Sequence, residues 1–258
     1  MGTTLEIQAV NLMLVFLRVG AFLQVLPFFS AIHFPGILRV AMAAFVALFL
    51  GPLLPPLELG PLGLGDWILL MATEVCVGLI LGFVARMVFY AVDLAAHLIG
   101  LETGLNVGAL LDPVHREATG APGMILFFLA AVVMLTLDLH HWMLAGFWRT
   151  YSVLPVGGVG LSPALFEAVV RHSALIFQVA IQMAAPVIAV SFVIMVVFSL
   201  FSRAVPQMNV FAESFAFRIA GGLLVLALTL HLTAQYVLNY LHRLPDDLLV
   251  VARLLHGG

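Results

Sequence analysis

The chain has 258 residues, of which 64% are hydrophobic and 9% charged, whereas soluble domains are about half apolar and about a quarter charged. Too few polar residues are present to cover the surface of a soluble globular protein, so the chain belongs in lipid or within a large assembly. The formal net charge is −3, the basic residues are scattered arginines and Cys76 is the one cysteine, which excludes a nucleic-acid-binding surface and a disulfide framework.

Six apolar segments approach or exceed the length of about 20 residues that a membrane-spanning helix needs. In chain order they are residues 8–29, 37–54, 67–100, 124–148, 173–201 and 210–241. Proline and glycine pairs such as Pro35-Gly36 and Gly157-Gly158 separate some of them and are typical of turns. The sequence therefore predicts an all-α, hydrophobic, multi-helix membrane protein.

Charged residues lie inside several of these segments. Arg18 lies in the first, and Glu74, Arg86, Asp93 and Glu102 lie along or just beyond the third. A charged side chain at the centre of a bilayer costs about 2.5–3.5 kcal/mol on insertion scales, so these groups should face protein or water. We expect parts of the chain to be surrounded by partner proteins. The arginines are too evenly spaced for the positive-inside rule to assign an orientation.

Small residues recur at every fourth position toward the end of the third segment, at Ala96, Gly100, Gly104 and Gly108. On a helix this spacing lets another backbone approach closely, which predicts tight helix packing. The helical pattern weakens after Gly104, and Asp112-Pro113 should end any helix. Two interpretations stay open. The segment is either a packed helix followed by an ordinary loop, or a deformable element, made flexible by its glycines, within a transport path.

Asp138, His140 and His141 are the residues most suggestive of catalysis or metal binding. Adjacent histidines point about 100° apart on a helix, so we do not expect them to hold one metal ion. A polar helix end at a membrane interface accounts for them better. The sequence has no nucleophile elbow and no phosphate-binding glycine motif. We therefore predict no catalytic residue, no metal site and no cofactor, and a protein that is not an enzyme.

Two passages carry a family resemblance. The first is Pro206-Gln207-Met208-Asn209-Val210-Phe211, between two long apolar segments. The second runs from Gly100 to Asn106 and leads to Asp112-Pro113. Together they resemble the FliR family of export subunits, whose injectisome relatives form the SctT family, and the hexapeptide favours the flagellar branch.

Weaker matches extend the resemblance over nearly the whole chain. They are Arg18 with Pro27, Pro35 and Arg39, then His140 with Trp142, and Ser152 with Leu154-Pro155-Val156-Gly157. Two places depart from the family pattern. Ser214-Phe215-Ala216 stands where a Gly-aromatic-Pro kink is usual, and Leu139 stands where a glycine often precedes the histidine.

The resemblance implies a subunit of a helical export gate in the bacterial inner membrane, at the flagellar basal body. A single copy would assemble with several copies of FliP and FliQ, with FlhB associated and FlhA nearby. Unfolded flagellar proteins would pass through the centre of the complex, which would be raised out of the bilayer toward the periplasm. The complex would also contact membrane lipid, and it would not bind nucleic acid.

The resemblance also divides the chain into long helical hairpins. Residues 1–165 would resemble a FliP subunit, and residues 166–258 would resemble the FliQ helix pair followed by a C-terminal helix. A loop that helps to plug the closed channel would map onto Leu105, Asn106, Val107, Gly108, Ala109, Leu110 and Leu111. Val107, Leu110 and Leu111 would form its seal, and Gly104 and Gly108 would supply its flexibility.

Three alternatives remain at the level of sequence. An injectisome subunit of the SctT type would use the same architecture. A self-contained polytopic transporter would need a substrate site near the bilayer midplane, but the chain shows no inverted repeat. A membrane enzyme would need a metal at Asp138, His140 and His141.

Overall fold

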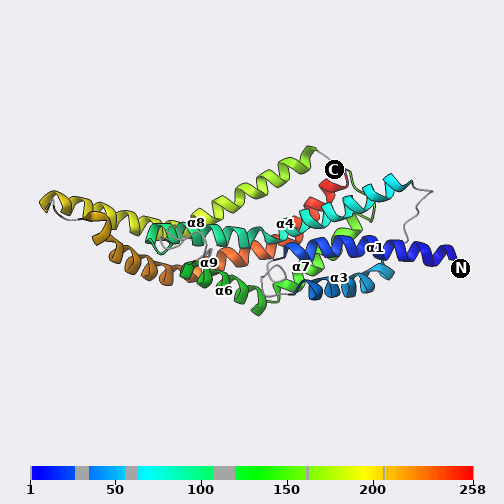
Figure 1. The fold of residues 1–258 in the computed structure, drawn as a ribbon, viewed down its shortest axis with the longest axis horizontal. Helices are drawn as coiled ribbons and strands as arrows, with labels where there is room; N and C mark the ends of the chain where they lie inside the picture. The colour runs from blue at the N-terminus through cyan, green and yellow to red at the C-terminus, as the bar shows by residue number, and fades with distance from the viewer. Residues whose placement is uncertain are drawn as a thin grey trace. The chain divides into compact units, whose positions relative to one another are not determined.

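The computed structural model of the chain is all-helical over the residues it describes, which are 2–26, 35–55, 63–106, 120–160, 163–205, 207 and 209–257. Within them lie seven α-helices and one short 3-10 helix (Figure 1). In chain order these are α1 (Gly2–Val25), α3 (Gly36–Leu50), η1 (Gly51–Leu53), α4 (Leu64–Thr103), α6 (Gly120–Thr136), α7 (Leu139–Val153), α8 (Pro163–Ala204) and α9 (Val210–Leu255). The predicted all-α class is confirmed.

The helices include several candidate membrane spans. Five are long and apolar enough to cross a membrane, or up to six if the pair α6 and α7 forms one span. Helices α4, α8 and α9 contain 40, 42 and 46 residues. At 1.5 Å per residue, each is about 60 Å long or more, roughly twice the thickness of the hydrocarbon core. These three helices are therefore longer than a bilayer requires.

The segment predicted as one helix over residues 124–148 is broken. The chain bends by 72° between α6, which ends at Thr136, and α7, which begins at Leu139. Asp138 in the break has a φ of 53°, in the left-handed region that aspartate tolerates better than most residues. The polar residues that were expected to form a helix end therefore lie at a sharp turn inside the segment predicted as one helix.

Helix α9 is longer than predicted. It continues past residue 241 to Leu255 and includes Pro245. The backbone of Pro245 packs against Gly146 on α7, where an added Cβ would lie 3.0 Å from the proline Cα. Helix α9 also runs without interruption through Ser214-Phe215-Ala216, so the absence of the family's usual proline there coincides with a continuous helix.

The chain forms two compact units. The first comprises Met1–Met87, His140–His172 and Arg243–Gly258. In it, Phe22 of α1 stacks on Phe147 of α7 with ring centroids 4.1 Å apart. Helix α1 also crosses α4 closely, because an added Cβ at Gly78 would meet the carbonyl oxygen of Arg18 and one at Gly82 would meet Val25. Glycine at these two positions allows the two backbones to approach.

The second unit comprises Val88–Leu139 and Ser173–His242. Helices α8 and α9 pack together in it, with the rings of Phe198 and Phe217 5.0 Å apart. Gly221 lies against Ile194 of α8, and Gly222 lies against Val187 of α8. Small residues on α9 thus allow α8 to approach, and the same stretch of α9 also contacts the end of α4.

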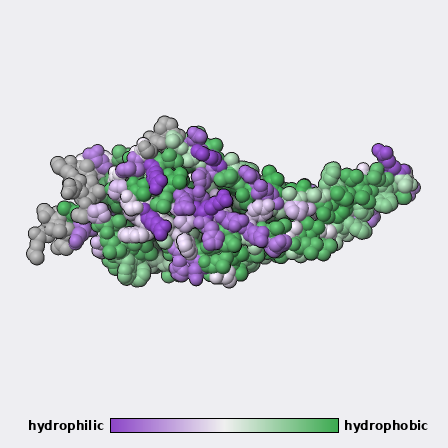
Figure 2. Space-filling model, turned by 180° about the vertical axis from the view of Figure 1, so that it is seen from behind, coloured by the Kyte–Doolittle hydropathy of each residue, from purple (hydrophilic) through white to green (hydrophobic). Residues whose placement is uncertain are grey.

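Large apolar side chains remain exposed on many helices. Figure 2 shows hydrophobic residues over much of one face of the molecule. Exposed members include Phe45 and Phe49 on α3, Phe192 on α8, and Leu224 and Leu228 on α9. In a membrane protein such a surface is covered by lipid or by other subunits.

Candidate functional site

The C-terminal end of α4 is closed by a glycine cap. Gly104 follows the helix with a φ of +81°, a conformation that L-residues other than glycine rarely adopt. Its N–H donates to the carbonyl oxygen of Leu101 at 3.2 Å, and the N–H of Asn106 donates to that of Gly100 at 3.2 Å. This arrangement satisfies carbonyls that a helix end otherwise leaves open. Gly104 therefore fixes the direction in which the chain leaves α4.

Asn106 joins the two ends of the segment 107–119. It is 8% exposed, and its side-chain amide lies against Gly100 on one side and Gly120, the first residue of α6, on the other. The chain thus leaves α4 and re-enters α6 at the same place.

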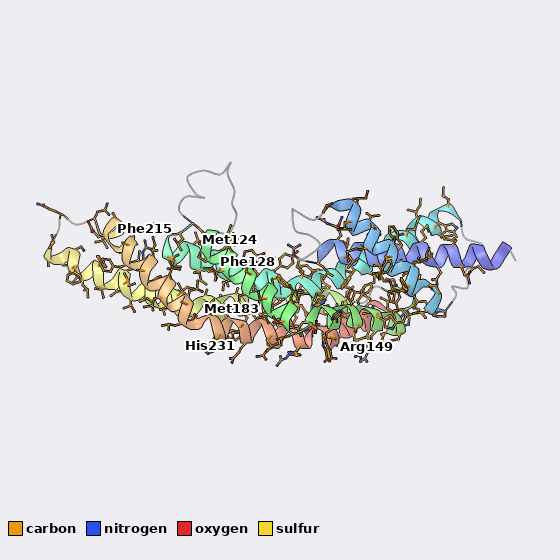
Figure 3. All side chains as sticks on the ribbon, turned by 90° about the horizontal axis from the view of Figure 1, so that it is seen from below. Met124, Phe128, Arg149, Met183, Phe215 and His231 are labelled. Atoms are coloured by element: carbon orange, nitrogen blue, oxygen red, sulfur yellow. The ribbon has the colours of Figure 1, made fainter. Side chains whose placement is uncertain are left out.

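Three neighbouring residues on one face of α9 contact the end of α4. An added Cβ at Gly104 would meet the ring of Phe215, which lies on the first part of α9 (Figure 3). An added Cβ at Gly222 would meet the methyl group of Thr103. Between them, Nη1 of Arg218 donates to the carbonyl oxygen of Glu102 at 3.3 Å.

Arg218 is only 6% exposed, so a cation is buried at the C-terminal end of α4. A positive charge there is favourable because the last carbonyls of a helix carry partial negative charge. We refer to Phe215, Arg218 and Gly222 as the α9 clamp. They were not among the predicted site residues, although their spacing of three and four positions is that of one helical face.

The predicted plug residues fall at the edge of the described structure. Leu105 is half-buried and Asn106 is buried, whereas Val107, Gly108, Ala109, Leu110 and Leu111 lie outside the described residues. Of the predicted packing positions, Ala96 is buried on α4 and Gly100 and Gly104 face Asn106 and Phe215. The plug and packing assignments therefore stay predictions.

The hexapeptide from Pro206 to Phe211 precedes and opens α9. Asn209 is exposed, and its Oδ1 accepts a hydrogen bond from the N–H of Ala212 at 3.3 Å, as a helix N-cap does. Gln207 lies exposed in a turn and Val210 is half-buried at the helix start. Pro206, Met208 and the side chain of Phe211 lie outside the part that the structure describes.

A second cluster, in the first unit, is a buried ion pair between α1 and α4. Nε of Arg18 donates to Oε2 of Glu74 at 2.6 Å and Nη2 donates to Oε1 at 3.0 Å, with both side chains 0% exposed. The guanidinium carbon also lies 4.6 Å from the centre of the Tyr151 ring, within the range of a cation–π contact. The prediction that Arg18 and Glu74 face protein or water rather than lipid agrees with this burial.

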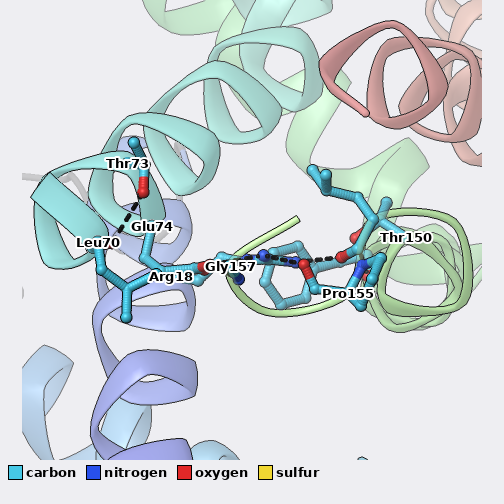
Figure 4. A network of polar contacts seen from close by, with 9 residues as sticks. Arg18, Leu70, Thr73, Glu74, Thr150, Pro155 and Gly157 are labelled. Carbon is cyan, nitrogen blue, oxygen red and sulfur yellow. Dashed lines mark hydrogen bonds and ion pairs between the residues drawn. The ribbon is translucent and has the colours of Figure 1, made fainter. Parts of the chain in front are cut away.

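The same pair binds the turn that follows α7 (Figure 4). Arg18 donates to the carbonyl oxygen of Leu154 at 2.8 Å and to that of Pro155 at 3.3 Å. Glu74 accepts the N–H of Gly157 at 2.8 Å. The structure thus brings together Arg18 and the 154–157 passage, two of the weaker matches to the family, which are far apart in sequence. Their burial and hydrogen bonding indicate a role in holding the turn.

The positions of His140 and His141 differ from the expectation that adjacent histidines on a helix point well apart. The rings of these two residues lie side by side with centroids 4.1 Å apart. The pair stands in the first turn of α7, directly after the bend.

Comparison with known proteins identifies the family. The family model for bacterial export proteins, family 1, matches residues 9–244. The flagellar biosynthetic protein FliR of Bacillus subtilis is 28% identical over 233 residues, covering 88% of each chain. FliR of Caulobacter vibrioides is 30% identical over 223 residues, covering 84% of this chain and 87% of the relative. FliR of Escherichia coli is 27% identical over 220 residues, covering 85% and 84%. The chain therefore belongs to the FliR family of bacterial export proteins, membrane components of the flagellar type III export apparatus that are not enzymes.

Proposed function

We propose that this chain is a core subunit of the flagellar export gate, in which it assembles with FliP and FliQ and forms part of the channel for unfolded flagellar proteins. FlhB would associate with this complex and FlhA would act nearby. The resemblance of the sequence motifs to the FliR family supports these partners. By the same resemblance, the energy for export would come from the partners and not from this chain.

The lengths of the helices support a multi-subunit assembly raised out of the bilayer toward the periplasm. Helices of 40, 42 and 46 residues exceed the hydrocarbon core, and apolar side chains such as Phe177, Phe192 and Leu228 are exposed along them. Apolar surface that extends beyond the lipid needs protein to cover it. Copies of FliP and FliQ would provide that cover.

Within this assembly, residues 1–165 would occupy the place of a FliP subunit and residues 166–258 that of a FliQ helix pair. The boundary falls close to the start of α8 at Pro163. Helices α8 and α9 favour this division because they follow each other in sequence and pack through Phe198 and Phe217. The helical hairpin would then be the repeated structural element of the gate.

The segment from Leu105 to Leu111 would plug the closed channel. The observation that carries this assignment is its base: Asn106 lies against Gly120, and the α9 clamp holds the end of α4. A loop anchored at both ends can yield in its middle and return to the same position. Val107, Leu110 and Leu111 would block water and ions by dewetting a narrow apolar constriction.

Assembly is tested by co-expressing the chain with the FliP and FliQ homologues of the same organism, followed by purification in mild detergent and native mass spectrometry. We expect a discrete complex that contains one copy of this chain. A stable protein that never joins these partners, alone or as its own oligomer, would contradict the proposal and favour a self-contained transporter.

The plug is tested by ion leakage through a gate that is not secreting. The double variant Leu110→Gly and Leu111→Gly should raise leakage, because it removes the apolar side chains of the constriction. The matched control, Leu110→Val and Leu111→Val, keeps the residues apolar and should leave the gate tight. Equal leakage in the glycine variant and the unmodified gate would rule out this plug.

A further inference from the structure

Helices α8 and α9 each contain residues that weaken a helix in its interior. Pro186 lies inside α8. It has no N–H to donate to the carbonyl oxygen of Gln182, four residues earlier, and its ring crowds that carbonyl, so a proline here bends the helix. Figure 1 shows that α8 changes direction part-way along its length. Gly221 and Gly222 lie inside α9, where glycine holds the helical backbone less firmly than alanine does.

The proline of α8 and the glycine pair of α9 lie at the same level of the hairpin. An added Cβ at Gly222 would lie 3.4 Å from Cγ1 of Val187, the residue directly after Pro186. An added Cβ at Gly221 would lie 3.4 Å from Cγ1 of Val190, about one helical turn farther along α8. Both helices can therefore change direction at one place.

Few contacts hold the hairpin beyond this level. Among the described residues of α8, several are buried before Pro186, the last of them being Ala184, whereas none is buried beyond Ser191. We refer to residues 187–204 of α8 and 210–220 of α9 as the hairpin arm. A segment with so little buried surface moves more readily than the packed part of the same helix.

The α9 clamp connects the hairpin arm to the end of α4. Phe215 and Arg218 belong to the arm, and they contact Gly104 and the carbonyl oxygen of Glu102. Gly222, the third member of the clamp, lies at the level where the two helices can bend. Bending the arm away from α4 would therefore withdraw the phenylalanine and the arginine while the glycine stays in place.

We propose that Pro186 and the Gly221-Gly222 pair form a hinge, through which movement of the hairpin arm tightens or loosens the hold of α9 on the end of α4. The role of this hinge rests on the proposed function. In the export gate, exposed apolar side chains of the arm such as Phe192 and Leu200 would be covered by neighbouring subunits, so the arm would move with them. The hinge would then transmit a movement of the partners to the base of the segment 107–119.

The hinge is tested by distance measurements within the full chain in nanodiscs, with and without the FliP and FliQ homologues. Ser199 on the arm and Val132 on α6 are exposed and belong to the same unit, so Ser199→Cys and Val132→Cys carry spin labels. Cys76→Ala removes the native cysteine from every labelled protein. Pulsed electron spin resonance then measures the distribution of label distances, which should be broad because the arm takes several angles.

The double variant Pro186→Ala and Gly221→Ala should narrow this distribution. Alanine restores the missing helical N–H and favours a straight helix. The Cβ added at Gly221 would meet the end of the flexible Ile194 side chain, at 2.9 Å, so the variant should fold. Pro186→Gly keeps the helix deformable and should leave the distribution broad. The matched control is Pro245→Ala, because Pro245 also lies inside a helix but is packed against Gly146, and this change should not alter the distribution.

Secretion shows whether the hinge serves export. In cells that carry the variant as their only copy, the double variant should join the FliP and FliQ homologues normally but should lower secretion of flagellar proteins severalfold. Pro186→Gly and Pro245→Ala should secrete as the unmodified chain does. Circular dichroism checks that each variant is folded.

Two outcomes would overturn the hinge. One is an equally broad distribution in the unmodified chain and in the double variant. The other is unchanged secretion by a double variant whose distribution has narrowed. A chain that never joins the FliP and FliQ homologues would instead contradict the proposed function, and the distances within the chain alone would still decide whether the arm bends at Pro186.

Discussion

Arg18 on α1 and Glu74 on α4 form a fully buried ion pair with an Nε–Oε2 distance of 2.6 Å, and both residues also bind the backbone of the turn after α7. Removing a charge of a pair that water cannot reach leaves the other charge without compensation. The pair and the turn therefore act as one structural unit.

Single replacement of either residue should destabilise the protein strongly. Arg18→Met or Glu74→Met should each cost about 3–5 kcal/mol, because an unpaired charge remains buried. The double variant should cost clearly less than the sum of the two, since both charges are gone, although the carbonyls of Leu154 and Pro155 lose their donor. Unfolding of the four proteins in detergent measures this coupling. Additive effects would show that the two side chains do not act as a pair.

The sequence indicated that Arg18 and Glu74 avoid lipid, but it did not pair them. They are separated by 56 positions, and Gly157 in the turn they hold is a further 83 positions along the chain. No local periodicity links such distant residues. Only the crossing of α1 and α4, which Gly78 and Gly82 allow, brings the two charges together.

Replacing Gly104 should disturb the end of α4. Gly104→Ala places a side chain at a φ of +81°, which costs about 1–2 kcal/mol, and its Cβ would also collide with the ring of Phe215. We expect a lower thermal midpoint for the purified complex and a leakier closed gate. Adding Phe215→Leu should recover part of the loss by relieving the collision but not the backbone strain.

Gly65 is the matched control for this variant. It lies in the first turn of α4, is exposed, and has no atom within 4 Å of an added Cβ. Gly65→Ala should be neutral or should stabilise the helix by up to about 1 kcal/mol. Equal losses at Gly65 and Gly104 would indicate a general sensitivity of α4 to alanine and not a special backbone conformation.

Asn209 should stabilise α9 as its N-cap. Asn209→Ala removes the acceptor for the N–H of Ala212 and should cost about 1 kcal/mol, whereas Asn209→Asp keeps an acceptor and should be nearly neutral. Thermal unfolding measures the cap, and co-purification with FliP and FliQ homologues measures assembly. If Asn209→Asp is stable but fails to assemble, the side chain serves a partner contact in addition to the cap.

Hydropathy located the long apolar helices but not their irregularities. Residues 67–100 and 173–201 fall within α4 and α8 because both helices are apolar over most of their length. The bend at Asp138 was missed because residues 124–148 were predicted as one apolar segment, although Asp138, His140 and His141 were expected to form a polar helix end. Helix α9 continues beyond the apolar segment 210–241 to Leu255 and passes through Pro245, a residue type that normally ends a helix. Packing against Gly146 overrides that tendency.

The site was predicted only in part for a similar reason. The glycines before Asn106 and the hexapeptide stand out as sequence motifs, whereas the α9 clamp consists of one phenylalanine, one arginine and one glycine on an ordinary apolar helix. Their role follows from contacts with Glu102, Thr103 and Gly104, which are more than 100 positions away. The available signal was an arginine within the apolar segment 210–241, namely Arg218.

Arg218 should control how firmly the base of the segment 107–119 is held. Arg218→Met keeps an apolar stem of similar length but removes the donor to the carbonyl of Glu102, and hydrogen bonds to charged groups contribute about 1.5–3 kcal/mol. We expect a lower thermal midpoint and more ion leakage through the closed gate. Arg218→Lys keeps the charge but lacks the planar guanidinium, so its stability and leakage should lie between those of the unmodified protein and Arg218→Met.

The control is Arg171→Met. The side chain of Arg171 is 69% exposed and lies 3.7 Å from Glu167, so its replacement should change the free energy of unfolding by no more than about 0.5 kcal/mol. A gate that stays tight and stable in Arg218→Met would mean that the end of α4 is held by Phe215 and Gly222 without the help of the arginine.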